Sequence, residues 1–233
     1  TLSGIDTRLA VIAVNTMLAS AAGAASGCVY SWRRFEKPDV TMMCNGMLGG
    51  LVSITAPCAF VASWAAVLIG LCAGVIVVEA SLWVEQRLRI DDPVGAISVH
   101  GVCGAFGVIS LGIFADGSYG EGLNGVPGNV TGLLYGDPGQ LLAALVGVGV
   151  NLMWVGTSAA LTFMLIDRLV GNRVSREAEL RGLDLSEMGM EGYFNADAPV
   201  AAAISGGRDP LAQSSSKLPS AAQLWVAPQP HRR

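Results

Sequence analysis

Five long apolar stretches constrain this chain more than any other feature of its sequence. A helix needs about 20 mostly apolar residues to cross the roughly 30 Å hydrocarbon layer of a membrane. Of the 233 residues, 52% are hydrophobic and only 14% are charged, whereas soluble domains carry about a quarter charged residues. The sequence therefore predicts an all-α integral membrane protein. The second stretch is short and rich in glycine, so we expect it to pack inside protein rather than to face lipid on all sides. The expected spans lie at about residues 9–32, 40–57, 62–86, 94–115 and 140–167.

The positive charges in the connections predict how the chain is oriented. Lysine and arginine occur before the second span, before the fourth span and after the fifth: Arg33, Arg34, Lys37, Arg87, Arg89, Arg168, Arg173, Arg176 and Arg181. The connections 58–61 and 116–139 contain neither residue type. Because these residues are enriched on the cytoplasmic side, we expect a cytoplasmic C-terminus and residues 1–8 outside. The location we expect is the cell (inner or plasma) membrane. The net charge of −4 argues against a nucleic-acid partner.

Small and polar residues within the spans predict how the helices meet. Gly23/Gly27 and Gly70/Gly74 are GxxxG pairs, which let helix backbones approach closely. Some of the glycines could instead leave room for a narrow lumen. Asn15, Thr16 and Asn45 are expected to form hydrogen bonds between helices. Glu79 is either drawn to the membrane interface or paired inside the bundle, and the sequence does not decide between the two.

The segment DDPVGAISVHG, residues 91–101, places His100 inside an apolar stretch. An acidic residue before Pro93 is a typical helix start. From there, His100 would lie about 12 Å along the helix, near the middle of the membrane, where ionisable groups are candidates for function. No carboxylate shares its helix face, so we expect a neutral imidazole in dry surroundings, which suits the passage of a small polar molecule or a proton. The alternative is a structural histidine bonded to a neighbouring helix, and Asp92 is either a helix cap or a buried anchor.

Several classes of function find no support in the residues. The five cysteines lack CxxC spacing and are interpreted as small core residues rather than as ligands or disulfides. We find no nucleophile–base constellation, phosphate-binding glycine loop or metal cluster, so neither an enzyme nor a cofactor is expected. The segment 195–233 is rich in Ala, Ser, Pro and Gln and is predicted to be disordered; His231 lies in it and is not expected to be a ligand.

Four segments together resemble the ammonium transporter, methylammonium permease and Rhesus family, in particular its bacterial ammonium transporters. They are AVNTMLASAAGA (13–24), CNGMLGGLVSITAPCAFV (44–61), DDPVGAISVHGVCGAFG (91–107) and RVSREAELRGLDLSEMGMEGY (173–193). The resemblance covers residues 1 to about 194. It implies a fold of eleven helices in two inverted halves, assembled as a homotrimer with one pore per subunit. This chain would supply the last five helices, in residues 1–170, followed by a cytoplasmic tail in residues 171–194.

The resemblance also implies a function and assigns roles to residues. Ammonium, with methylammonium as a possible substrate, would lose its proton outside, and ammonia would cross a hydrophobic lumen lined by two histidines. His100 would be the second of these, while Asp92 and Asn45 would be structural or capping residues near the pore. The first histidine, the phenylalanine gate and the recruitment site would lie upstream of Thr1, which itself falls near an outer-vestibule serine of the family. The alternatives are an ammonium sensor of the same fold and a truncated fragment that does not conduct.

The tail is expected to have a regulatory role. Gly182, Leu183 and Asp184 match a recognisable motif of the family's C-terminal region, which couples neighbouring subunits and in many bacterial members receives a PII-type regulatory protein. Many members have a His-Gly-Glu stretch shortly afterwards, whereas residues 188–191 here read Met-Gly-Met-Glu. Regulation by a PII-type protein therefore stays open at this point.

Overall fold

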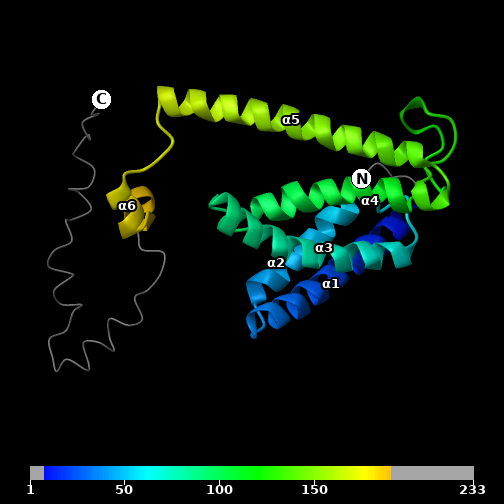
Figure 1. Ribbon diagram of the computed structural model, residues 1–233, viewed down its shortest axis with the longest axis horizontal. Helices are drawn as coiled ribbons and strands as arrows, with labels where there is room; N and C mark the ends of the chain where they lie inside the picture. Colours follow the sequence, from blue (N-terminus) through cyan, green and yellow to red (C-terminus); the bar gives the residue numbers. More distant parts are fainter. Residues whose placement is uncertain (1–7, 190–233) are drawn as a thin grey trace. The chain divides into compact units, whose positions relative to one another are not determined.

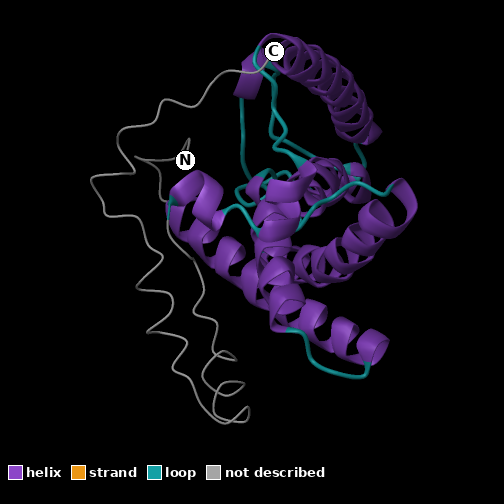
Figure 2. Cartoon of the chain, turned by 90° about the vertical axis from the view of Figure 1, so that its left-hand side faces the viewer, coloured by secondary structure: helices purple, strands orange, loops and turns teal. Residues whose placement is uncertain are grey.

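The computed structural model describes residues 8–189, and within this range every regular element is helical (Figure 2). Figure 1 shows the order of the helices along the chain. They are α1 (Arg8–Phe35), α2 (Val40–Thr55), α3 (Ser63–Trp83, followed by a π-helical turn at Val84–Leu88), a second π-helical turn (Ile97–Val102) that leads into α4 (Cys103–Phe114), α5 (Pro138–Leu169) and α6 (Arg176–Arg181). The all-helical class predicted from the sequence is confirmed.

Four of the five predicted spans are helices long and apolar enough to cross a membrane. The exception is α2, which has 16 residues and is therefore about 24 Å long. Its start is fixed by Asp39, whose carboxylate accepts from the backbone N–H groups of Thr41 at 2.8 Å and Met42 at 3.1 Å. Its end is close to Pro57, which has no N–H with which to continue a helix. One face of α2 is buried and the other is exposed, so the short second stretch does pack against protein on one side.

Glycines hold α1, α2 and α3 together. A methyl group built on Gly46 would lie 2.5 Å from the carbonyl oxygen of Gly23, and one built on Gly27 would lie 3.0 Å from that of Met42. On α3, methyl groups on Gly70 and Gly74 would collide with the backbone of α1. The predicted GxxxG contacts are thus confirmed, because no residue larger than glycine fits at these crossings without movement of the backbone.

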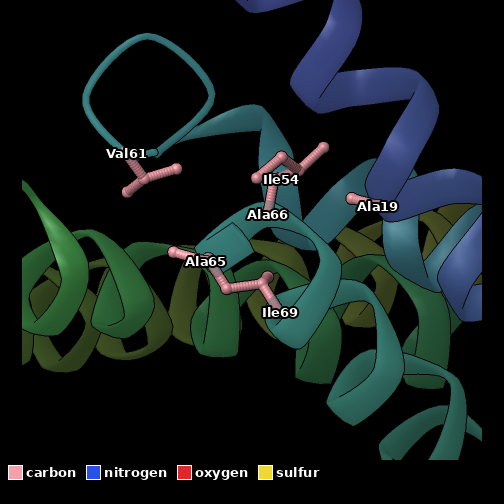
Figure 3. Packing of buried hydrophobic residues seen from close by; sticks show 6 residues of the cluster. All are labelled: Ala19, Ile54, Val61, Ala65, Ala66 and Ile69. Atoms are coloured by element: carbon pink, nitrogen blue, oxygen red, sulfur yellow. The ribbon is translucent and has the colours of Figure 1, made fainter. Parts of the chain in front are cut away.

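A small apolar core lies where these three helices meet, and Figure 3 shows its side chains. Its members are fully buried or nearly so: Ala19, Ile54, Val61, Ala65, Ala66 and Ile69. Alanine contributes half of these residues, which fits the close approach of the backbones. The helices are therefore packed through short side chains and not through a layer of large ones.

Polar groups fix the start of α1 to two connections. The Asn15 side chain is fully buried, and its amide nitrogen donates to the carbonyls of Cys58 at 2.9 Å and Val61 at 2.8 Å. Arg8 donates to the Ala59 carbonyl and to the Ser118 hydroxyl, both at 2.7 Å. The bond predicted for Asn15 is therefore present, although it reaches a connection rather than a helix. For Thr16 the prediction is wrong: its hydroxyl bonds the Ile12 carbonyl of its own helix at 2.7 Å, because a threonine can always reach the preceding turn.

The long helix α5 is anchored mainly at its start. A methyl group on Gly112 of α4 would lie 2.6 Å from the Cα of Leu141, and Ala144 is buried. Beyond Ala144 most of the large apolar side chains of α5 are exposed; Met153, for example, is 75% exposed and Trp154 is 74% exposed. The helix thus carries an extensive apolar surface, as a membrane span requires.

Among the described residues, 163–189 belong to a second compact unit. Its helix α6 begins where the Ser175 hydroxyl accepts from the backbone N–H of Ala178 at 3.3 Å, and it ends at Gly182, whose φ is +89°. The exposed ion pair of Arg173 with Glu179 is 3.3 Å long. The predicted disorder of 195–233 and the assignment of Thr1 both lie outside the described residues.

Candidate functional site

His100 lies in the π-helical turn Ile97–Val102, and the helix begins later than the sequence predicts. Pro93 and Val94 form a turn closed by the bond from Gly95 N to Asp92 O at 2.9 Å, and Gly95 has a φ of +70°. Because a left-handed residue interrupts the helix, the helix begins at Ala96 and not at Pro93. His100 is then about 6 Å along the helix, rather than the predicted 12 Å.

Asp92 is both a cap and a buried anchor, so the two alternatives left open by the sequence are combined. Only 6% of Asp92 is exposed. Its carboxylate accepts from the backbone N–H groups of Ile97 at 3.2 Å and Ser98 at 3.3 Å, and from the Ser98 hydroxyl at 3.3 Å. A negative charge on these orphan N–H groups is favourable at the start of a helix. Asp92 therefore defines where the turn that carries His100 begins.

The imidazole of His100 lies on the open side of this turn. Ser98, Val99 and Cys103 are at most 2% exposed and face the bundle, whereas His100 is exposed. The dry, enclosed surroundings that we expected are therefore not provided by the described residues, because His100 points away from the face of α4 that packs on α2 and α3. A neutral imidazole in this position offers one N–H donor and one acceptor nitrogen to whatever covers that face.

Asn45 packs against Gly95, which lies two residues before the π-helical turn that carries His100. It is 8% exposed, and a methyl group on Gly95 would lie 2.9 Å from its amide nitrogen and 3.7 Å from the hydroxyl of Ser81. Among the residues the structure describes, Asn45 contributes packing and not the interhelical hydrogen bond that we expected. It thus supports the turn by contact, at a place where only glycine leaves enough room.

Three features of this region could not be anticipated. The π-helical turn leaves no mark in the residue pattern. The same is true of two hydroxyl bonds: Ser98 donates to Asp92, and Ser53, a buried residue of α2, donates to the Cys103 carbonyl. The sequence left Glu79 either drawn to the interface or paired inside the bundle; Glu79 is exposed, and its carboxylate accepts a hydrogen bond from the Tyr30 hydroxyl of α1 at 2.6 Å, so the pair is not enclosed by the described residues. A tyrosine one helix away gives no signal in a single sequence.

The described residues show no group of three or more His, Cys, Asp or Glu placed to hold a metal ion. The cysteines are free thiols spread over the helices and their connections. His100 is the only imidazole in the described range.

In the C-terminal unit, Gly182 ends α6, and Asp184 begins a π-helical turn that extends to Met188. Residues 171–174 and Leu183 line an open groove of about 590 Å³ together with three residues of this turn: Asp184, Glu187 and Met188. Gly182 is suited to its place because its φ is positive, a conformation that other residues avoid. The Gly-Leu-Asp motif thus marks a change of direction in the chain.

These features define a multi-pass α-helical membrane protein. A sequence model of the Ammonium Transporter Family matches residues 2–193, and the chain belongs to that family. It is 47% identical to the ammonium transporter Amt2 of Archaeoglobus fulgidus, in a match that covers 89% of this chain and 45% of Amt2. It is 35% identical to the ammonium transporter Amt1 of Haloferax mediterranei, covering 78% of this chain and 32% of that protein.

Solved structures agree with this assignment. A "Sensor Amt Protein" matches with a TM-score of 0.68 and 32% identity, over 78% of this chain and 43% of the other. Mep2 of Candida albicans matches with a TM-score of 0.67 and 26% identity, over 83% and 42%. The chain shares the fold of the part of these proteins that it matches. It spans less than half the length of the curated relatives it matches.

Proposed function

We propose that this chain is the C-terminal part of a transporter that moves ammonium or ammonia through a histidine-containing hydrophobic pore. The observation that carries the proposal is the exposed His100 on a turn held by the buried Asp92, in a chain of the Ammonium Transporter Family. A polar ring on an apolar span needs a partner or a water-sized substrate beside it. Its donor and acceptor nitrogens match the lone pair and N–H groups of ammonia.

The path would form between this chain and a second half that lies upstream. In transporters built from inverted repeats, the site lies at the boundary of the repeats. Seen in this way, the open side of the His100 turn is the surface that the other half covers. The same proposal includes methylammonium as a possible substrate and a homotrimer in the cell membrane, with the start of this chain outside.

The test is uptake of labelled methylammonium by cells that lack their own ammonium transporters and express the complete gene product. We expect His100→Ala to lower uptake by about tenfold, the effect of losing one hydrogen-bonding group of about 1.4 kcal/mol. Met153→Ala on α5 is the matched control, because it changes a side chain that is 75% exposed. Equal uptake by the natural protein and His100→Ala, at equal amounts in the membrane, would refute the role of His100.

A sensor of the same fold is the second candidate, favoured by the likeness to the "Sensor Amt Protein". A sensor would bind ammonium without carrying methylammonium into the cell. Two measurements on the same preparation separate the two candidates. One is the uptake of methylammonium, and the other is the hydrogen exchange of residues 171–189. Ammonium-dependent protection of the tail without uptake would identify a sensor, and the absence of both would point to a fragment that does not conduct.

The tail around Gly182, Leu183 and Asp184 would couple neighbouring subunits and could receive a PII-type protein. What supports this is its position directly after the last span and its groove of about 590 Å³. Pull-down of a PII protein by the complete gene product, with Asp184→Ala for comparison, tests the regulatory part independently of uptake. Binding that is the same with and without residues 171–189 would exclude the groove as the docking site.

A further inference from the structure

The π-helical turn that carries His100 is held at both ends, and its second anchor has no role in the function proposed above. Ser53 of α2 is fully buried. Its hydroxyl donates to the carbonyl oxygen of Cys103 at 3.0 Å. Cys103 is the first residue after the turn, so this bond is located where the π-helical spacing changes to the α-helical one.

Close contacts around this bond fix how α4 is rotated. A methyl group on Gly49 would lie 3.2 Å from the sulfur of Cys103, and one on Gly107 would lie 2.5 Å from the carbonyl oxygen of Ser53. The Cys103 thiol also approaches the Ala73 carbonyl of α3, at 3.9 Å. Cys103 is thus held by its side chain and by its main chain. The residues after the turn have little freedom to rotate about the helix axis.

The location of the change in spacing determines where His100 points. Each residue of an α-helix turns the next side chain by about 100°, whereas a π-helical turn holds an extra residue and so changes this direction. If the change from π-helical to α-helical spacing moved by one residue, the imidazole of His100 would turn away from its present direction. Asp92 fixes the first residues of the turn through Ile97 and Ser98, and Ser53 fixes the last.

We propose that Ser53 is a positioning residue for His100: its bond to the Cys103 carbonyl keeps the end of the π-helical turn in place and so directs the imidazole. The inference rests on the proposed transport function, because it assumes that the direction of His100 matters. It concerns a residue outside the turn and on another helix. Loss of the Ser53 hydroxyl leaves the glycine contacts of α2 and α4 intact, so the bundle is expected to fold.

The test compares Ser53→Ala with Ser110→Ala in the complete gene product. Ser110 is a matched control: it lies in α4, is fully buried, and its hydroxyl has no hydrogen-bond partner among the described residues. We expect Ser53→Ala to lower the maximal rate of methylammonium uptake by about fivefold. The half-saturating concentration and the amount of protein in the membrane should stay the same, and Ser110→Ala should match the natural protein.

Two further measurements separate positioning from a general structural role. In a His100→Ala background, Ser53→Ala should cause no additional loss, since the group that it directs is gone. The second measurement does not depend on transport: a cysteine is placed at position 100 and its alkylation rate is measured by mass spectrometry. Adding Ser53→Ala should change this rate. Adding Ser110→Ala should leave it unchanged.

The outcomes distinguish the two proposals. Equal losses from Ser53→Ala in both backgrounds, or unchanged uptake together with an unchanged alkylation rate, would overturn the role of Ser53 while leaving that of His100 intact. Unchanged uptake in His100→Ala would instead refute the role of His100 in transport, on which the inference rests. A changed alkylation rate in that case would still show that Ser53 directs the side chain at position 100.

Discussion

The helices α1 and α5 have similar lengths, 28 and 32 residues, and both are apolar enough to cross a membrane, yet they are held very differently. In α1, Gly23 and Gly27 lie against the backbones of α2 and α3. In α5, Gly147, Gly149 and Gly156 have no atom within 4 Å of the place where a methyl group would be. Apolar composition therefore places a helix in the membrane, but contacts between small residues decide which helices form a bundle.

The largest effect should come from filling one of the packed positions. Gly46→Val would place side-chain atoms against the Gly23 carbonyl, 2.5 Å from the position of the first added carbon, and overpacking of this kind costs about 1–3 kcal/mol or more. We expect a strong loss of protein in the membrane and a much lower temperature of unfolding in detergent. Gly156→Val, on α5, is the control and should leave both nearly unchanged. Similar losses from the two variants would show that packing does not distinguish the helices.

A pair of aspartates sharpens the comparison at the helix starts. Asp92 caps the turn before α4 and is 6% exposed, whereas Asp137 caps α5 through a 2.7 Å bond from Gly139 N and is exposed. Asp92→Ala removes the acceptor of several buried donors, and we expect about 2 kcal/mol of destabilisation. For Asp137→Ala we expect about 0.5–1 kcal/mol, since water can replace the lost acceptor. Thermal unfolding of the two purified variants measures the difference, and a larger loss at Asp137 would contradict it.

The sequence predicts those parts of the molecule that depend on residue type and spacing. The apolar stretches locate the spans to within a few residues, and the spacing of Gly70 and Gly74 predicts a close helix crossing. Asp92 and His100 are found because charged or titratable groups are rare in such stretches. What the sequence does not contain is the geometry between helices.

The start of the helix that carries His100 illustrates this limit. Asp92 followed by proline predicts a helix from Pro93, but a left-handed Gly95, packed on Asn45 and Ser81, delays it. The bond between Ser53 and Cys103 joins residues 50 positions apart. Such contacts depend on how three helices cross, which no local pattern specifies.

The smallest expected effect concerns Asn15, the buried side chain through which α1 is hydrogen-bonded to the connection between α2 and α3. Burial raises the pKa of the Cys58 thiol, which lies in the connection between α2 and α3, and the carbonyl of the same residue accepts from Asn15 at 2.9 Å. Since the thiolate is the reactive form, the alkylation rate of Cys58 should rise only at higher pH than that of an exposed cysteine. A cysteine introduced at Val126, which is 64% exposed, provides the reference profile.

Replacing Asn15 by alanine links this reactivity to the hydrogen bonds of that side chain. Without the amide, the carbonyls of Cys58 and Val61 lose a buried donor, and they regain a partner only if water enters the connection. Water beside Cys58 lowers the desolvation that raises its pKa, so the pH profile of alkylation in Asn15→Ala should move toward that of the cysteine at position 126. The profile at position 126 should itself stay where it was. If the Cys58 profile did not move, the Asn15 amide would not be what keeps water out of this connection, and the burial of Cys58 would come from its packing against the apolar core around Ala19 and Ile54.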